Sequence, residues 1–165
     1  MLIRPETPAN IDVIHDLTQA AFAPKAFSDG TEGPIINAMR DAGDLTLSLV
    51  AEDAGTIIGH VAFSPAHISE AAGDWYGLGP ISVREDRQGQ GIGRALIEAG
   101  IATLAEQGAA GCVLTGNPNI YQRIGFRSDG NLHHAGTEDR HVHWRLINGA
   151  APKGQLRFAP ALDAA

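Results

Sequence analysis

The stretch from Leu78 to Leu104 constrains the fold of this chain more than any other part of the sequence. Apolar residues at 78–83 predict a strand, and an amphipathic run at 95–104 predicts a helix. Between them, Gln88-Gly89-Gln90-Gly91-Ile92-Gly93-Arg94 forms a glycine-rich turn that leads directly into the helix. Free backbone N–H groups and the positive end of the helix dipole converge at such a turn. The stretch therefore predicts an anion-binding site, most often one for phosphate.

The spacing of the glycines separates this turn from two other phosphate loops. A dinucleotide-binding turn has Gly-x-Gly-x-x-Gly and an acid at the end of the next strand, where residues 112–115 carry none. A triphosphate loop ends in Gly-Lys-Ser or Gly-Lys-Thr, unlike Gly93-Arg94-Ala95. Glycines at alternate positions instead expose bare backbone on which a pyrophosphate can lie. The alternative is a flexible turn that is glycine-rich without binding anything.

Hydrophobic periodicity and turn signals place the other elements, and residues 23–31 and 65–74 are predicted to be loops. The strand at 110–115 follows a helix crossover, so it is expected to run parallel to the strand at 75–83. The order predicts an α/β (α+β) fold in one domain, residues 1–165: a mixed sheet of six to seven strands flanked by about four helices. Strands are predicted at 2–4, 45–52, 56–64, 75–83, 110–115, 141–146 and 155–158, and helices from Pro8 to Phe22, from Glu32 to a cap at Gly43, from Ala95 to Gln107 and over 119–124.

Charge and composition exclude several classes of protein. A net charge of −7 argues against non-specific nucleic-acid binding, which needs clustered Lys and Arg. Pro5 and Glu6 interrupt the N-terminus where a secretory signal needs an apolar core, and no apolar run reaches membrane-spanning length. The lone cysteine, Cys112, lies in an apolar run and is interpreted as a small buried side chain. We expect a cytoplasmic protein with no membrane contact.

The glycine turn and a second motif resemble one known family. Gln88 to Gly93, with the strand before it and the helix after it, is similar to the acetyl-CoA-binding motif Gln/Arg-x-x-Gly-x-Gly/Ala of the GCN5-related N-acetyltransferase (GNAT) superfamily. Residues 117–126, Asn-Pro-Asn-Ile-Tyr-Gln-Arg-Ile-Gly-Phe, resemble the Pro-x-x-Tyr-x-x-x-Gly-Phe signature of a small bacterial subgroup of predicted acetyltransferases. The resemblance implies the GNAT fold, with the sheet splayed between the fourth and fifth strands, and makes a homodimer plausible.

The resemblance also implies which residues hold acetyl-CoA. Backbone groups of the strand Ile81-Ser82-Val83 would bind the pantetheine arm, and the N–H groups of Gln88, Gly89, Gln90, Gly91, Ile92, Gly93 and Arg94 would bind the pyrophosphate. Tyr121 would be the general acid that protonates the departing thiolate, unless its ring only packs on the sheet with its hydroxyl in water. Asn117 either contacts the pantetheine or caps the short helix.

The general base and a metal site are the least determined by sequence. Glu32 is the candidate base, but an acid at the start of a helix is often only a partner of the helix dipole. His60 lies in a strand and is interpreted as a core histidine. His141 and His143 would share one face of a strand, but no acid or cysteine completes a ligand set, so no metal is predicted.

These observations predict an acetyl-CoA-dependent N-acetyltransferase. A deprotonated primary amine would attack the thioester directly in a ternary complex, and the acidic balance favours a small amine, a lysine or an N-terminal amino group. The alternative is a non-catalytic acyl-CoA-binding or sensing module. It would keep the glycine turn and differ at Tyr121 and in the acceptor pocket.

Overall fold

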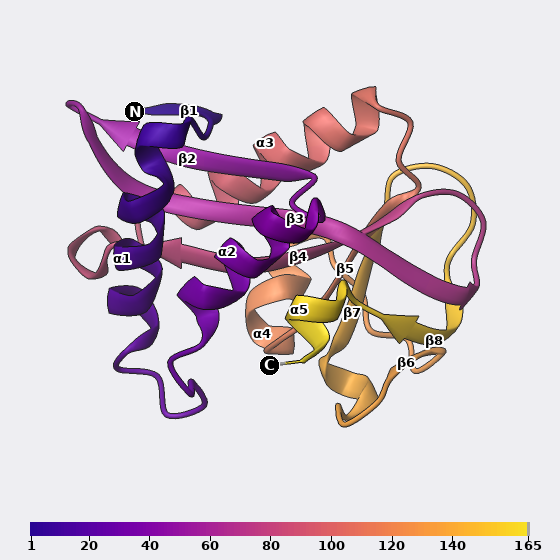
Figure 1. The fold of residues 1–165 in the computed structure, drawn as a ribbon. Helices are drawn as coiled ribbons and strands as arrows, with labels where there is room; N and C mark the ends of the chain where they lie inside the picture. Colours follow the sequence, from indigo (N-terminus) through magenta and orange to yellow (C-terminus); the bar gives the residue numbers. More distant parts are fainter. Residues whose placement is uncertain (165) are drawn as a thin grey trace.

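The computed structural model describes residues 1–164, which form an open sheet of eight β-strands and five α-helices (Figure 1). Short 3-10 turns begin at Pro8, Glu85, Gln122 and Asp139. The strands are β1 (Leu2–Pro5), β2 (Leu47–Asp53), β3 (Thr56–Glu70), β4 (Trp75–Val83), β5 (Gly111–Thr115), β6 (Leu132–His134), β7 (Val142–Leu146) and β8 (Lys153–Arg157), and the helices are α1 (Ile11–Phe22), α2 (Glu32–Ala42), α3 (Ile92–Glu106), α4 (Pro118–Tyr121) and α5 (Pro160–Asp163).

The predicted mixed sheet is confirmed and is larger than expected. Its strands follow the order β1-β2-β3-β4-β5-β7, with β4 and β5 parallel and the other neighbours antiparallel. The loop predicted at 65–74 is confirmed only for residues 71–74, because β3 continues to Glu70 and its second half pairs with β8. Strand β8 pairs in turn with the short β6, which the sequence did not predict. Pro65 is exposed and pairs with Tyr76 of β4.

The predicted splay between β4 and β5 has a local cause. The two strands pair only from Trp75↔Gly111 to Gly77↔Val113. Just beyond, β4 advances by three residues from Leu78 to Ile81 while β3 advances by two. The extra residue is a β-bulge, which bends the strand that carries it. Strand β4 therefore leaves β5 after Gly77, and among residues 1–164 this edge of β4 has no strand partner from there to Val83.

Helices cover both faces of the sheet, with α1 and α2 in front and α3 behind it in Figure 1. On the α3 face, a side chain at Gly100 would collide with the ring of Phe63, so the glycine lets helix and strand approach closely. The large apolar residues of the amphipathic run at 95–104 are buried: Leu96, Ile97, Ile101 and Leu104. Arg94 and Glu98 are four residues apart on α3, a spacing that predicts an ion pair, but this prediction is wrong because Arg145 of β7 binds both Glu98 oxygens at 2.7 and 3.1 Å.

Candidate functional site

The uncovered edge of β4 presents backbone groups to the splay. Arg84 donates its N–H to the Ile58 carbonyl of β3 at 2.8 Å, so this residue points toward β3. Backbone direction alternates along a strand, and Ile81 and Val83 therefore direct their N–H and C=O groups to the opposite, open side. The Val83 carbonyl accepts a hydrogen bond from the Gln88 side chain there, at 3.0 Å. Ser82, the residue between them, is buried and pairs with His60 of β3.

The glycine turn has the backbone geometry that anion binding requires. Gly89 and Gly91 have φ of +77° and +83°, a region that favours glycine. The first bond within α3 runs from the Ala95 N–H to the Gly91 carbonyl at 3.0 Å. The N–H groups of residues 92–94 therefore have no carbonyl partner within the helix. Ile92 is buried and anchors the turn, whereas residues 88–91 are exposed.

A brace that the sequence did not reveal holds this turn in place. Arg87 donates to Asp53 at 2.9 Å and to Gln90 at 3.1 Å. Asp53 ends β2, so the bond connects the glycine turn to the β2–β3 hairpin. The hydrogen bond and the charge of Arg87 lower the pKa of Asp53, which keeps the pair ionised near neutral pH.

The second motif forms a compact turn at the end of β5. The Asn117 side chain accepts the Asn119 N–H at 2.9 Å, so it caps α4 as one of the two sequence interpretations predicted. The Tyr121 ring covers Gly116, where a side chain would collide with it, and packs edge-on against Phe126 at 6.0 Å. Burial raises the pKa of Tyr121 above its ordinary value of 10. The phenol is thus protonated at neutral pH and able to donate.

A cavity of ≈ 890 Å³ opens where β4 and β5 separate. Its walls come from the bulged part of β4 and from the turn that carries Tyr121 and Asn117. The volume matches the clefts that bind small molecules. The lining residues are Phe22, Phe27, Leu78, Gly79, Pro80, Ile81, Thr115, Gly116, Asn117, Pro118, Asn119, Ile120, Tyr121, Thr137, Arg140 and His141.

A smaller cavity of ≈ 470 Å³ adjoins the first and shares part of its wall, including Leu78, Gly79, Pro80 and Thr137. Its lining includes Asp29, Glu32 and Asp163, three carboxylates from separate parts of the chain. Glu32 stands at the start of α2, as predicted, and accepts a hydrogen bond from Ser28. Aromatic side chains complete the lining, including Phe27, which is 80% exposed. The cavity thus combines negative charge with apolar surface.

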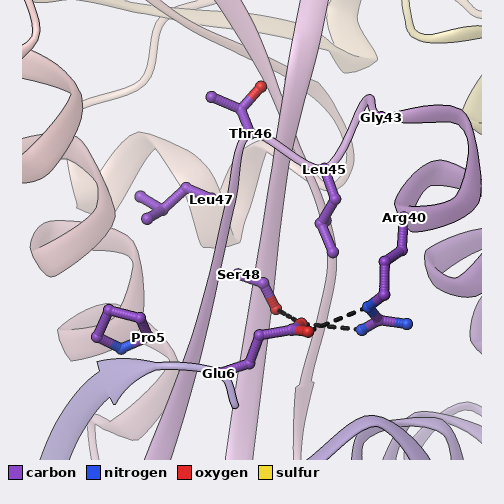
Figure 2. Close-up of a pocket in the computed structure, with 8 residues that line it drawn as sticks. All are labelled: Pro5, Glu6, Arg40, Gly43, Leu45, Thr46, Leu47 and Ser48. Carbon is purple, nitrogen blue, oxygen red and sulfur yellow. Dashed lines mark hydrogen bonds and ion pairs between the residues drawn. The ribbon is translucent and has the colours of Figure 1, made fainter. Parts of the chain in front are cut away.

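A third hollow lies away from these two, where β1 and β2 meet the end of α2 (Figure 2). Arg40 and Ser48 both point to the Glu6 carboxylate, which Arg40 binds at 2.8 and 3.0 Å. Burial alone would raise the pKa of Glu6, but hydrogen bonds from Arg40 and Ser48 outweigh it and lower the pKa. Ser48 in turn contacts His60 Nε2 at 2.7 Å. His60 is fully buried, as predicted for a core histidine, and burial lowers its pKa to about 4.

The remaining histidines do not form the arrangement considered from the sequence. His143 lies within β7, buried, with Nε2 2.9 Å from the Gly116 carbonyl. His141 precedes that strand in a 3-10 turn, so the two do not share one strand face. Among residues 1–164, no group of three His, Cys, Asp or Glu side chains is arranged to hold a metal ion. In the same range, no helix has the length and apolarity needed to cross a membrane.

The splayed sheet with its glycine turn defines a class of protein, and sequence comparison identifies that class. A family profile described as Acetyltransferase (GNAT) domain matches residues 44–128. The chain is also 39% identical over 127 residues to the uncharacterized N-acetyltransferase YhbS of Escherichia coli K12, covering 76% of this chain and 73% of YhbS. The chain therefore belongs to the GNAT acetyltransferase family.

Two solved structures are similar over almost the entire chain. A GNAT family acetyltransferase from Brucella melitensis, in complex with acetyl-CoA, is 42% identical with a TM-score of 0.86, covering 98% of this chain and 97% of that one. E. coli YhbS in complex with CoA is 30% identical with a TM-score of 0.88, covering 98% and 91%. An aminoglycoside 6'-N-acetyltransferase complexed with coenzyme A shares the fold at 17% identity, with a TM-score of 0.65 and a coverage of 92% and 99%.

The structure brings some of the predicted site residues together around one cavity and places others beside it. Ile81, Asn117 and Tyr121 line the large cavity, and Glu32 lines the smaller one. The turn at residues 88–94 lies beyond both cavities, at the other end of the uncovered β4 edge. Sequence reasoning missed Thr137 and Asp163, which lie in segments that carry no motif.

Proposed function

We propose that this chain is an acetyl-CoA-dependent N-acetyltransferase that acetylates a primary amine by direct attack in a ternary complex. The observation that carries the proposal is the separation of β4 from β5 after Gly77. It leaves a strand edge, an anion-binding turn and a protonated tyrosine along one path. Coenzyme A has the matching chemistry in the same order: a pyrophosphate, an amide-containing arm and a sulfur.

The proposal gives each end of the path a defined task. The N–H groups of residues 88–94 hold the pyrophosphate, and the open-side groups of Ile81 and Val83 bind the arm as an added strand would. For the second bond the Gln88 side chain releases the Val83 carbonyl. Bound acetyl-CoA supplies the thioester. Tyr121, which keeps its proton because burial raises its pKa, donates that proton to the leaving sulfur.

The smaller cavity supports a cationic acceptor. Asp29, Glu32 and Asp163 attract an ammonium group, and the adjoining aromatic rings suit an apolar chain attached to it. The charge of Glu32 serves this attraction whether or not it is also the general base. A lipophilic or diamine-type primary amine fits this lining better than an anionic acceptor does.

The direct test is release of free thiol from acetyl-CoA in the presence of butylamine, putrescine, a lysine-containing peptide or a peptide with a free N-terminus. We expect turnover with at least one amine, and a fall of about 100-fold or more in kcat for Tyr121→Phe. Coenzyme A should bind the variant as it binds the wild type. Coenzyme A binding without thiol release on any amine would instead indicate a sensing module.

A second test concerns the pyrophosphate site. A Cβ atom at Gly93 would lie 3.7 Å from the Val83 side chain and 3.8 Å from that of Ile81, which are ordinary contact distances, and thermal unfolding of Gly93→Leu checks that the variant folds. It would, however, place a side chain where the proposal puts phosphate oxygens. Calorimetry should show a large loss of coenzyme A affinity, whereas Glu106→Leu at the exposed end of the same helix should bind normally. Unchanged affinity in Gly93→Leu would refute the phosphate assignment.

A further inference from the structure

Three side chains beside the cavities form a continuous chain of hydrogen bonds. Asp163 Oδ1 lies 2.8 Å from His134 Nε2, and His134 Nδ1 lies 2.8 Å from the Thr137 hydroxyl. The residues come from α5, β6 and the loop after β6. Their order, hydroxyl to imidazole to carboxylate, is the order used to draw a proton away from a hydroxyl group.

When the His134 imidazole is neutral, its two partners determine which atom donates in each of the two hydrogen bonds. An ionised carboxylate only accepts, so His134 Nε2 carries the hydrogen that is donated to Asp163. The other ring nitrogen of the neutral imidazole is then an acceptor, and the Thr137 hydroxyl donates to it. Asp163 is itself held, because its Oδ2 accepts the Phe158 N–H at 2.9 Å. The Phe158 ring packs edge-on against the imidazole at 5.0 Å.

Thr137, at one end of this hydrogen-bond network, lies where acetyl transfer would take place. Thr137 lines both the large and the small cavity, along with the bulged part of β4. Glu32 lines only the small cavity, and Tyr121 lines only the large one. Thr137 therefore faces the junction between the proposed thioester and amine sites. Thr137, His134 and Asp163 all lie outside residues 44–128, the segment that the family profile matches.

We propose that Thr137, His134 and Asp163 form the proton relay that deprotonates the acceptor amine. The proposal rests on the proposed acetyltransferase function. Thr137 is the group that faces the amine, and His134 and Asp163 act through it as positioning residues. Their contribution is to make the hydroxyl a better proton acceptor at the moment when its own proton moves to His134.

The step balances as follows. One proton of the ammonium group passes to the Thr137 oxygen while the Thr137 proton passes to His134 Nδ1, and from there it is lost to water. The amine nitrogen then bonds to the acetyl carbon, and the carbon–sulfur bond breaks. The sulfur takes the Tyr121 proton, and the second proton released by the nitrogen restores Tyr121 through water. The products are an amide, coenzyme A thiol and one free proton.

A spectroscopic test reads the relay without any acceptor. In protein labelled with ¹⁵N-histidine, NMR should show His134 with its hydrogen on Nε2. Asp163→Asn keeps the size and still accepts the Phe158 N–H, but its amide NH₂ would donate to Nε2. The hydrogen should then move to Nδ1, which can no longer accept from Thr137. Asp139→Asn is the matched control, because Asp139 faces the neighbouring His133 at 2.8 Å and should alter only that ring.

A kinetic test connects the relay to transfer, with acetyl-CoA and butylamine or putrescine as probes. Asp163→Asn and Thr137→Val should each lower kcat by about 100-fold with unchanged coenzyme A affinity, and Thr137→Val should also leave the amine KM unchanged. His134→Gly should also have a lower kcat, and added imidazole should restore part of it. A merely structural defect would not be restored in this way. Asp139→Asn should keep the full rate.

Three results would overturn the relay. One is a His134 hydrogen on Nδ1 in the wild type, whatever the activity. Another is normal kcat in Asp163→Asn with the tautomer reversed. The third is an acetyl ester on Thr137 after incubation with acetyl-CoA, which would make Thr137 a nucleophile. The proposed function fails on different evidence, namely the absence of thiol release with every amine, so the two failures are distinguishable.

Discussion

Two histidines of this fold each belong to a hydrogen-bond network with a hydroxyl and a carboxylate, and the two networks differ in which group stands in the middle. In the buried network, Ser48 stands between His60 and Glu6 and already donates its hydrogen to Glu6. In the relay, His134 stands between Thr137 and Asp163. Only the second arrangement leaves a hydroxyl that faces a cavity and donates to a free imidazole nitrogen.

Burial also separates the two histidines. His60 is 0% exposed, whereas the His134 side chain is 18% exposed at a cavity wall. Among residues 1–164, His60 Nδ1 has no hydrogen-bond partner, which lowers the stability of the fold. A proton relay, in contrast, needs a partner on both ring nitrogens. The same three chemical groups therefore serve stability in one place and, in our proposal, proton transfer in the other.

The largest effect on stability should come from removing Arg40, the cation of the buried network that contains His60, Ser48 and Glu6. Arg40→Met leaves the Glu6 carboxylate without its ion pair beneath α2. The two side chains are 19% and 17% exposed, so we expect the lower end of the range for broken buried pairs, about 3 kcal/mol of unfolding free energy. The melting temperature should fall by about 6–12 °C. Coenzyme A affinity should not change, and a loss of affinity would contradict the separation of the two networks.

The pH dependence of stability should come next in size. Because the pKa of folded His60 is lowered to about 4, the unfolded chain binds more protons below pH 6.5. Stability due to this group is present above pH 6.5 and is lost as pH falls, by about 2 kcal/mol between pH 7 and pH 5. Urea unfolding of His60→Gln should lack this part of the slope. His67→Gln, an exposed position on the same strand, should retain it.

Removing the middle hydroxyl of the buried network should have a smaller effect. Ser48→Ala deletes the bonds to Glu6 and His60 without opening a large cavity, and we expect a loss of about 1 kcal/mol in the free energy of unfolding. The rate of acetyl transfer should stay the same. A fall in kcat with normal stability would show that the buried network reaches the site after all.

The smallest effect should come from a conservative change in the relay itself. Thr137→Ser keeps the hydroxyl that the relay needs and removes only a methyl group. Steady-state kinetics should give a kcat close to that of the wild type, in contrast to Thr137→Val. Equal losses in Thr137→Ser and Thr137→Val would mean that the methyl group, and therefore packing, is what matters.

Local patterns predicted the elements whose evidence lies within a few residues. The strand, glycine turn and helix from Trp75 to Glu106 could be predicted because alternation, glycine spacing and helical periodicity agree there. The loop predicted at 65–74 was six residues too long, because Pro65 and the polar residues after it resemble a turn. Only the partner strand β8, far along the chain, shows that the segment is paired.

Side-chain partners from distant segments were beyond reach. Arg94 is four residues from Glu98, yet Arg145 reaches Glu98 across the fold with two bonds, so helical spacing alone predicted the wrong pair. The relay is a stronger case of the same problem. Asp163 follows His134 by twenty-nine positions and meets it only because α5 packs back toward the cavities.

The uncovered edge of β4 also concerns how the protein behaves in solution. A strand edge that lacks a partner is a template for other extended chains, and proteins usually shield such edges. Here, in our proposal, the shield is the small molecule itself. Purified protein without coenzyme A should therefore aggregate sooner at high concentration than protein saturated with it. Depletion of the coenzyme would reduce the amount of usable protein as well as its turnover.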